Sequence, residues 1–364
     1  MKRRTFLSAS VATGGVAIAA GVAGEFLSGK RFPSHVPAPA PAASSSASAG
    51  QSFTLPKVTG PTLPKGAELD IPGLSAFYTP NAQFYRVDTA LTIPKLAVKS
   101  WQLKVHGMVD KPFTMDFGEL VRRPMVEHDI TLCCVANYVG GPLTGNARWE
   151  GALLADVLRE AGIQSGAQQI VMTDVNGMTI GVSLDAVLDG RTALLAIGQN
   201  GQVLEPKHGF PVRVVVPGLY GYVSATKWVV DMKLTTYGAE KVYYTQRGWA
   251  AEAPIKVESR IDVPKTGTTL KAGKNVIAGV AWREHVGVAA VEVGVDGVFS
   301  EATLAVQDTL DTWRQWYYVW DATPGAHKIQ VRATDQLGNT QTAVNKQVFP
   351  DGATGYDTIH VTVS

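Results

Sequence analysis

The chain has 364 residues, of which 45% are hydrophobic and 18% charged, and its formal net charge at pH 7 is +2. This length favours two domains, because a single core rarely grows past about 250–300 residues. The small net charge gives no support for nucleic acid or an acidic membrane surface as a partner. The only cysteines are the neighbours Cys133 and Cys134, which excludes a disulfide framework. The sequence contains no Cys-x-x-Cys or His-x-x-x-His pair. It therefore does not predict a zinc or iron–sulfur site built from protein ligands alone.

Residues 1–30 carry the pattern of an export signal. Two arginines in Lys2-Arg-Arg-Thr-Phe-Leu7 precede a mildly apolar run from Ser8 to Gly24. This pattern indicates a twin-arginine signal, with a short membrane anchor as the alternative. We therefore expect export to the periplasm or to the outer face of the cytoplasmic membrane. Residues 31–52 are rich in Pro, Ala and Ser and predict a tether with too little apolar surface to fold.

Residues 53–254 mix short strand patterns with short helical patterns. Strands are expected over 100–107, 170–173 and 212–216. Helices are expected over 114–121 and 152–162, the second ending at Gly162. Without a regular βαβ repeat, this mixture favours an α+β fold. No Gly-x-Gly-x-x-Gly or Walker loop occurs, which argues against nucleotide binding.

Residues 255–364 have a different character. Strand patterns over 288–295, 316–320 and 328–333 are separated by turn sequences such as Asp296-Gly297. This spacing predicts an all-β, immunoglobulin-like sandwich, a fold that usually serves packing or association. We expect the charged stretch Arg283-Glu-His285 to be a solvated strand end.

The two cysteines lie in Thr131-Leu-Cys-Cys-Val-Ala-Asn-Tyr138, at the end of a strand-like run. Successive side chains of a strand point to opposite faces, so only one thiol can face a given pocket. Three interpretations of that thiol remain open. It could be an inert buried residue, a thiolate nucleophile with a cationic neighbour, or the single soft ligand of a metal or metal cofactor.

Four motifs occur in an order that resembles the sulfite oxidase family of molybdenum enzymes. They are Phe84-Tyr-Arg-Val-Asp-Thr89, the cysteine segment followed by Ala147-Arg-Trp-x-Gly151, His208-Gly-Phe-Pro-Val-Arg213, and Thr226-Lys-Trp228. The resemblance runs from about residue 84 to the C-terminus. It implies a sulfite-oxidase-like molybdopterin-binding catalytic domain (53–254) and an immunoglobulin-like dimerisation domain (255–364), and therefore a homodimer.

The resemblance also implies a cofactor and the residues that bind it. In the family, one cysteine thiolate completes the coordination of a molybdenum held by a pterin, and this ligand corresponds to Cys134. Arg86 corresponds to a substrate-side arginine, and we expect Cys134 and Arg86 to be the catalytic residues. The residues expected to bind the cofactor are Phe84, Tyr85, Arg86, Asp88, Cys134, His208, Arg213, Thr226 and Lys227. Arginine suits a bidentate phosphate contact and lysine a point charge.

Departures from the family pattern bear on the substrate. Sulfite-oxidising members carry arginines just after the cysteine, where this chain has Tyr138 and Val139. They place an active-site tyrosine past the Lys-Trp motif, whereas here Trp249 follows Arg247-Gly, and Tyr243-Tyr244 comes several residues earlier. We therefore expect an exported enzyme that performs two-electron oxygen-atom transfer on a small molecule other than sulfite.

No Cys-x-x-Cys-His motif occurs, so we expect no haem, and electron transfer through a separate protein. One alternative is a reductase of S- or N-oxides from the same superfamily. The other, from a different functional class, is an envelope binding module without a cofactor.

Overall fold

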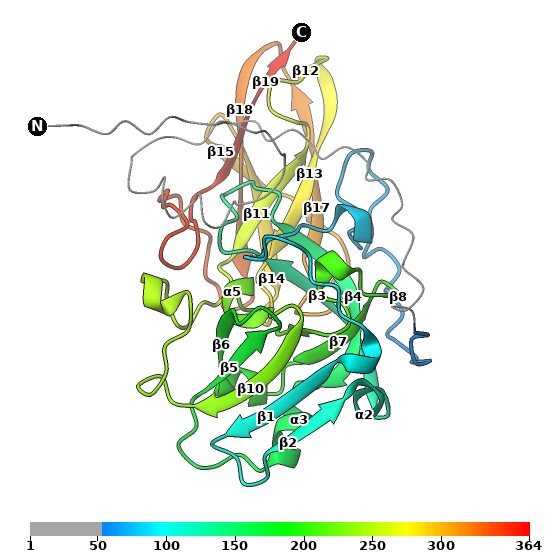
Figure 1. Cartoon of the computed structure of the whole chain (residues 1–364). Helices are drawn as coiled ribbons and strands as arrows, with labels where there is room; N and C mark the ends of the chain where they lie inside the picture. The colour runs from blue at the N-terminus through cyan, green and yellow to red at the C-terminus, as the bar shows by residue number, and fades with distance from the viewer. Residues whose placement is uncertain (1–52) are drawn as a thin grey trace, which may run out of the picture.

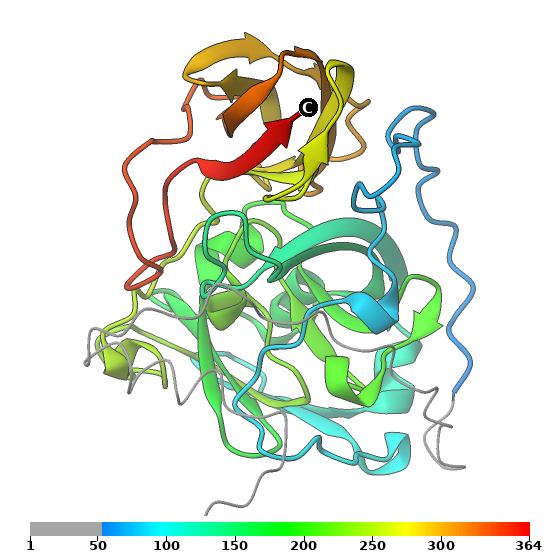
Figure 2. The same ribbon diagram turned by 90° about the horizontal axis from the view of Figure 1, so that it is seen from above.

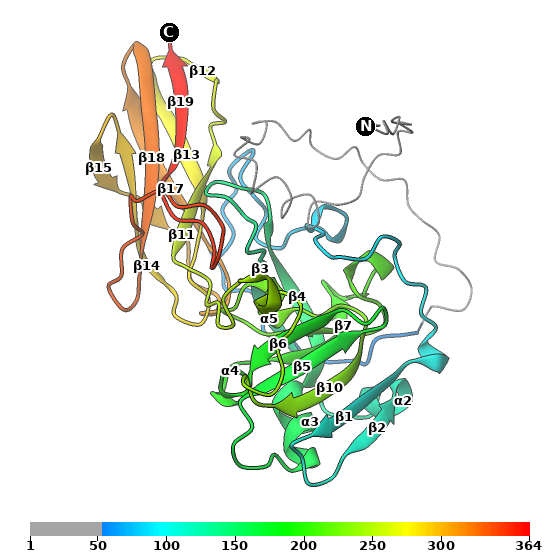
Figure 3. The ribbon, with the colours of Figure 1, turned by 60° about the vertical axis from the view of Figure 1, so that its left-hand side comes forward.

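The computed structural model describes residues 53–364, so the predicted export signal (1–30) and tether (31–52) lie outside the described residues. Four sheets form two groups: strands β1 to β10 build one group, and strands β11 to β19 build the other (Figure 1). Within residues 53–364, short helices accompany only the first group (Figure 3). This confirms an α+β fold followed by an all-β sandwich, with fewer helical residues than strand residues.

The first sheet has the strand order β2-β1-β10-β5-β6. Strands β1 and β10 run parallel, and the other neighbours are antiparallel. Exposed and buried residues alternate along β1, so that Leu103 and Val105 enter the core. The bounds are β1 Gln102–Gly107, β2 Phe113–Asp116, β5 Gln169–Asp174, β6 Thr179–Ser183 and β10 Val229–Thr235.

The second sheet has the order β3-β4-β7-β8, and β9 also pairs with β7. Every residue of β7 is buried, because one hydrophobic core lies on each face of this sheet. Strand β3 ends at Cys133, which pairs with Thr144. The bounds are β3 Met125–Cys133, β4 Thr144–Leu153, β7 Leu194–Gln199, β8 Gln202–Val203 and β9 Arg213–Val215.

The helices are short: α2 Phe117–Val121, α3 Leu154–Ala161, α4 Leu184–Leu188 and α5 Gly221–Ser224. The predicted helix over 152–162 is confirmed from Leu154 as α3, with Gly162 (φ +69°) as its C-cap, whereas residues 152–153 belong to β4. The predicted helix over 114–121 is wrong in its first half. Residues 113–116 pair with β1, and Asp116 then caps α2 in a capping box with Glu119.

The remaining strands form a two-sheet sandwich with the orders β11-β13-β17-β16 and β12-β19-β18-β14-β15. The predicted strands over 288–295, 316–320 and 328–333 are confirmed as β14, β17 and β18. The bounds are β11 Glu258–Val263, β12 Thr269–Leu270, β13 Gly273–Trp282, β14 Val288–Val295, β15 Val298–Glu301, β16 Thr303–Leu304, β17 Arg314–Ala322, β18 Gly325–Asp335 and β19 Asp357–Val363.

The sandwich is bonded to the first group through the segment that precedes β17. The Trp313 indole N–H donates to the Phe77 carbonyl at 3.0 Å, and the Trp313 amide donates to Thr131 Oγ1 at 2.7 Å. The Thr131 amide in turn donates to the Asp311 carbonyl at 2.9 Å. Strand β3, which leads to Cys133, is therefore hydrogen-bonded to the sandwich as well as to its own sheet.

The expectation of a solvated strand end at residues 283–285 is wrong for Glu284. This residue is buried, and neither carboxylate oxygen has a hydrogen-bond partner. The turn after β13 packs against the first group, where a Cβ added at Gly218 would lie 3.0 Å from His285 Cβ. Burial raises the pKa of Glu284 well above its usual range. Within residues 53–364, none of the helices is long and apolar enough to span a bilayer.

Candidate functional site

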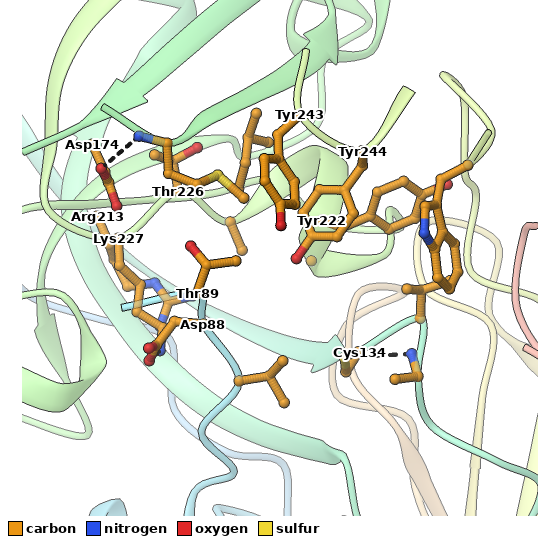
Figure 4. A pocket seen from close by; sticks show the side chains of 18 of the residues that line it. Asp88, Thr89, Cys134, Asp174, Arg213, Tyr222, Thr226, Lys227, Tyr243 and Tyr244 are labelled. Atoms are coloured by element: carbon orange, nitrogen blue, oxygen red, sulfur yellow. Dashed lines mark hydrogen bonds and ion pairs between the residues drawn. The ribbon is translucent and has the colours of Figure 1, made fainter. Parts of the chain in front are cut away.

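A cavity of about 750 Å³ opens beside the end of β3. Figure 4 shows two unlike walls: Asp88, Arg213 and Lys227 lie on one side, and Tyr222, Tyr243 and Tyr244 lie on the other. Cys134 lies at the end of the tyrosine side. The lining residues come from the segments 84–85, 87–89, 134–136, 174–180, 213–228 and 243–249, together with Phe349 from the sandwich.

Of the two neighbouring cysteines, only Cys134 lines the cavity. Cys133, the last residue of β3, is fully buried in the core. The chain turns directly after it, and the Ala136 amide donates to Cys134 Sγ at 3.4 Å. The structure therefore shows the predicted division into one packed cysteine and one available cysteine.

The environment of Cys134 disfavours a free thiolate. Burial raises the pKa of the thiol to about 11, although the Ala136 amide and the charge of Lys227 act in the opposite direction. A thiol with so high a pKa is a poor nucleophile near pH 7. A metal could still bind it, because coordination removes the thiol proton.

Arg213 and Lys227 lie close together on the charged wall because glycine stands between them. Gly209 has φ +111°, and a Cβ added there would lie 2.9 Å from Arg213 Cβ and 3.2 Å from Lys227 Cβ. Arg213 Nη1 donates to the His208 carbonyl at 3.1 Å, and the guanidinium lies 4.9 Å from the Trp149 ring centroid. His208 is fully buried behind this wall.

Two polar atoms in this region are buried without a hydrogen-bond partner: Arg213 Nε and His208 Nδ1. Burial lowers the pKa of His208 to about 3, so the ring is neutral at pH 7. Nε2 lies 3.3 Å from the Asn81 carbonyl and donates to it, which leaves Nδ1 as an acceptor. Burial lowers the pKa of Arg213 to about 10, so this side chain remains a cation. Such unpaired groups are rare in protein interiors and point to a missing partner.

Asp88 neutralises cations at the charged wall. Its carboxylate lies 2.8 Å from Lys227 Nζ and 2.8 Å from Arg86 Nε. Burial alone would raise the pKa of Asp88, but the bonds from Arg86 and Lys227 leave it below its usual value. Arg86 itself is not among the lining residues. Its side chain is 33% exposed at the edge of the site.

The other predicted site residues also gather here. Phe84, Tyr85 and Thr226 line the cavity. The Phe84 ring packs edge-on against His208 and Trp149, with centroid distances of 5.8 Å and 5.6 Å. The structure thus brings the predicted residues of all four motifs to one place, with His208 buried behind the wall and Arg86 at its edge.

Sequence reasoning missed the aromatic wall. Tyr243 and Tyr244, which come several residues earlier than the tyrosine of the family pattern, both line the cavity, as do Tyr222, Trp249 and Phe349. The adjacent pair Tyr243-Tyr244 and the nearby Trp249 were the available sequence signal. By contrast, neither Tyr138 nor Val139 lines the cavity, and Tyr138 is 56% exposed.

Among residues 53–364, no set of three or more His, Cys, Asp or Glu side chains could hold a metal ion. A metal at Cys134 would therefore need most of its ligands from a cofactor. The comparisons with known proteins bear on that cofactor. Residues 90–243 match the family model described as the oxidoreductase molybdopterin binding domain.

Several curated proteins are similar to this chain. The uncharacterized oxidoreductase YuiH of Bacillus subtilis is 35% identical over 135 residues, which cover 37% of this chain and 65% of that protein. Human mitochondrial sulfite oxidase is 28% identical over 317 residues, covering 73% of this chain and 57% of the human protein. A rice NADH nitrate reductase is 32% identical over 195 residues, covering 46% of this chain and 21% of the reductase. The chain thus spans less than two thirds of each of these relatives.

Among solved structures, the crystal structure of the sulfane dehydrogenase SoxCD from Paracoccus pantotrophus shares the fold. Its TM-score is 0.66 at 20% identity, and the match covers 87% of this chain and 92% of that chain. A molybdopterin-binding oxidoreductase domain is incompatible with the alternative of a cofactor-free binding module. The chain is therefore an oxidoreductase with a molybdopterin-binding domain over residues 90–243 and a sulfite-oxidase-like fold.

Proposed function

We propose that the protein is an exported oxidoreductase that performs two-electron oxygen-atom transfer on a small molecule other than sulfite. The observation that carries this proposal is the position of Cys134, which lies in one cavity with the charged wall and the aromatic wall. Arg213 and Lys227 on the charged wall suit a phosphorylated cofactor, and the aromatic wall leaves room for a substrate beside the thiol.

The residues present fit a molybdopterin cofactor. When bound, the cofactor supplies the oxygen-atom transfer and the redox chemistry, with Cys134 as the one protein thiolate ligand. Arg213, whose Nε has no partner, and Lys227 would hold the phosphate. His208 was expected to bind the cofactor, and its free Nδ1 would do so as a hydrogen-bond acceptor.

The lining supports a substrate other than sulfite. Sulfite is a small anion and would need cations that are free to bind it. Arg213 is assigned to the phosphate, and Arg247 is stacked on the Tyr243 ring. Lys227 is neutralised by Asp88 at 2.8 Å, and Arg86 bonds the same carboxylate. On the opposite wall, Tyr222 donates its hydroxyl hydrogen to the Ala250 carbonyl at 2.8 Å and presents its ring to the cavity. Aromatic rings bind neutral or apolar groups better than a hydrated anion.

The same wall favours a second candidate, the reduction of an S- or N-oxide. The oxygen of such a compound is a strong hydrogen-bond acceptor, and its substituents are apolar. Tyr243 and Tyr244 line the cavity as phenols, and burial raises the pKa of Tyr244 above its usual value. A phenol that keeps its proton remains a donor to the oxide oxygen at neutral pH.

Export, electron transfer and association complete the proposal. Arg3 and Arg4 support a twin-arginine route, and electrons would pass to or from a separate protein.

Val276 and Val319 face each other across β13 and β17 and are 40% and 50% exposed. We place a homodimer contact on this sheet, so Val319→Asp should shift the sedimentation of the protein from dimer to monomer.

The test uses protein purified from a host that makes the molybdenum cofactor. We expect about one molybdenum per chain by mass spectrometry. With a reduced viologen dye as electron donor, dimethyl sulfoxide or trimethylamine N-oxide should be turned over. Sulfite, assayed with ferricyanide as acceptor, should react slowly. Molybdenum-free protein would contradict the cofactor assignment, and fast sulfite oxidation with micromolar KM would contradict the proposed substrate.

A further inference from the structure

The aromatic wall is a continuous set of rings that the proposed cofactor contacts do not use. Tyr222 lies 5.3 Å from Tyr244 and 5.6 Å from Trp249, measured between ring centroids. Tyr243 extends the row at 5.2 Å from Tyr244, and Phe349 continues it at 5.2 Å from Trp249. These are the distances of edge-to-face aromatic packing, which holds the rings in fixed relative positions.

Phe349 comes from a distant part of the chain. It lies in the segment 336–356 between β18 and β19, which we call the β18–β19 segment. Figure 2 shows this orange-to-red segment leaving the sandwich and running down to the first group of sheets. Phe349 is 47% exposed and lines the cavity. The sandwich thus contributes a ring to the wall of the cavity.

Several contacts hold the β18–β19 segment in place beside the cavity. Lys256 Nζ bonds Asp351 Oδ1 at 2.9 Å and the Gly352 carbonyl at 2.7 Å. The Ala250 amide donates to the Pro350 carbonyl at 3.2 Å. Gly248 has φ +86°, and a Cβ added there would lie 3.3 Å from Phe349 Cζ. Hydrogen bonds therefore hold the residues that directly follow Phe349, and the lack of a side chain at Gly248 lets the Phe349 ring lie close to it.

The charges around this wall select against cationic ligands. The carboxylates that line the cavity, Asp88 and Asp174, lie on the opposite side (Figure 4), so a cation finds no counter-charge among the rings. Arg247 lies 3.5 Å from the Tyr243 ring centroid and already occupies a face that could attract a cation. The Tyr222 hydroxyl is engaged with Ala250. What remains is a flat, apolar surface.

We infer that Tyr222, Tyr244, Trp249 and Phe349 form a substrate subsite for a neutral, flat apolar substituent, best met by an aryl group. The reaction at the sulfur or nitrogen that carries this substituent rests on the proposed function, but the binding preference does not. For an aryl methyl sulfoxide the balanced reaction is sulfoxide plus two electrons and two protons to sulfide plus water. The electrons come from the reduced viologen dye of the assay.

The test compares phenyl methyl sulfoxide with dimethyl sulfoxide in the molybdenum-loaded enzyme. We expect kcat/KM for the aryl compound to exceed that for dimethyl sulfoxide by at least about tenfold, the lower end of what one apolar contact difference provides. Phe349→Ala should lower this ratio about tenfold, through KM. Phe349→Leu, which keeps an apolar side chain, should lower it less. Phe299→Ala removes a sandwich ring that does not line the cavity and should leave the ratio unchanged.

Equal kcat/KM for the two sulfoxides, or a Phe349→Ala enzyme with the parental ratio, would overturn the subsite. Binding measured by equilibrium dialysis separates this failure from failure of the proposed reaction. If phenyl methyl sulfoxide binds at least about tenfold tighter than dimethyl sulfoxide and Phe349→Ala removes the difference, the subsite holds even without turnover. Tighter binding of benzyltrimethylammonium than of phenyl methyl sulfoxide would show a cation site and overturn the neutral class.

Discussion

The Lys227 ammonium and the Asp88 carboxylate lie 2.8 Å apart, and their side chains are only 9% and 10% exposed. Burial lowers the pKa of Lys227 to about 8, although Asp88 raises it. The lysine is therefore a cation at pH 7 that depends on a nearby anion. Asp88 supplies that anion in this structure, and a phosphate could replace it.

Lys227→Met should therefore lower the cofactor content of the purified protein. Losing a charge-assisted hydrogen bond costs about 1.5–3 kcal/mol, or roughly ten- to a hundredfold in affinity. Asp88→Asn, which removes the competing carboxylate, should keep the cofactor. Molybdenum by mass spectrometry and pterin fluorescence after oxidation measure the content. Lys241→Met is the control, because Lys241 is exposed and outside the cavity lining. Equal content in both lysine variants would contradict the phosphate role.

Cys134→Ser should abolish activity, whereas Cys133→Ser should retain most of it. Only Cys134 lines the cavity, and Cys133 is packed in the core. A serine hydroxyl is a harder ligand than a thiolate and keeps its proton near pH 7. Activity per folded chain and molybdenum content should be measured together. Loss of activity in both variants, with both folded, would remove the assignment of Cys134 as the ligand.

Changing Arg3 and Arg4 together to lysine should keep the folded enzyme in the cytoplasm. The twin-arginine pair is read by a receptor, so equal positive charge does not replace it. Fractionation followed by an activity assay of each compartment measures the outcome. Changing Lys2 to arginine is the control and should leave export intact. Normal export of the double lysine variant would contradict the twin-arginine route.

Stability should fall as pH rises towards 8, in part because of Glu258. Burial raises the pKa of this carboxyl from its usual value near 4.5 to about 8, although Lys256 opposes the shift. Because the pKa of Glu258 is higher in the folded state than in the unfolded state, the stability contributed by its protonated carboxyl is fully present below about pH 4.5. This stability is lost as pH rises through 8. Glu258→Gln should remove this loss. Its advantage over the parent should be larger at pH 8 than at pH 5 by at least about 1.4 kcal/mol, the equivalent of one pKa unit.

Urea unfolding at the two pH values provides the measurement for Glu258. The exposed Glu301, changed to glutamine, is the matched control and should not alter the pH dependence. If Glu258→Gln and the parent lose the same stability between pH 5 and pH 8, the buried carboxyl is not responsible for that loss.

Removing residues from Ile255 onward should leave a poorly stable first group. Trp313 belongs to the core of that group, and its indole and amide donate to Phe77 and Thr131. In the full chain, Trp313→Ala should cost about 3–5 kcal/mol, measured by thermal or urea unfolding. Val298, which lies on β15 and is 73% exposed, is the control when changed to alanine and should cost far less. A truncated chain as stable as the parent would show that the first group folds independently.

Local patterns in the sequence determined much of this protein. Cys133 ends a strand that packs in the core, and the turn directly after it places Cys134 at the cavity. A glycine with positive φ caps α3 at Gly162. The order of four short motifs identified the cofactor family, because each motif places its functional groups within a few neighbouring residues. In all these cases the deciding contacts lie close together in the chain.

Only the tertiary structure decided the features that depend on distant segments. Phe349 reaches the cavity because bonds from Lys256 and Ala250 fix the β18–β19 segment beside Trp249, a hundred residues earlier. Glu284 is buried because its turn packs against the first group, although its local sequence is charged. Asp88 meets Lys227 across 139 positions. No local periodicity encodes such contacts, since they arise from how whole sheets pack, and packing sets both the burial and the charge of the site.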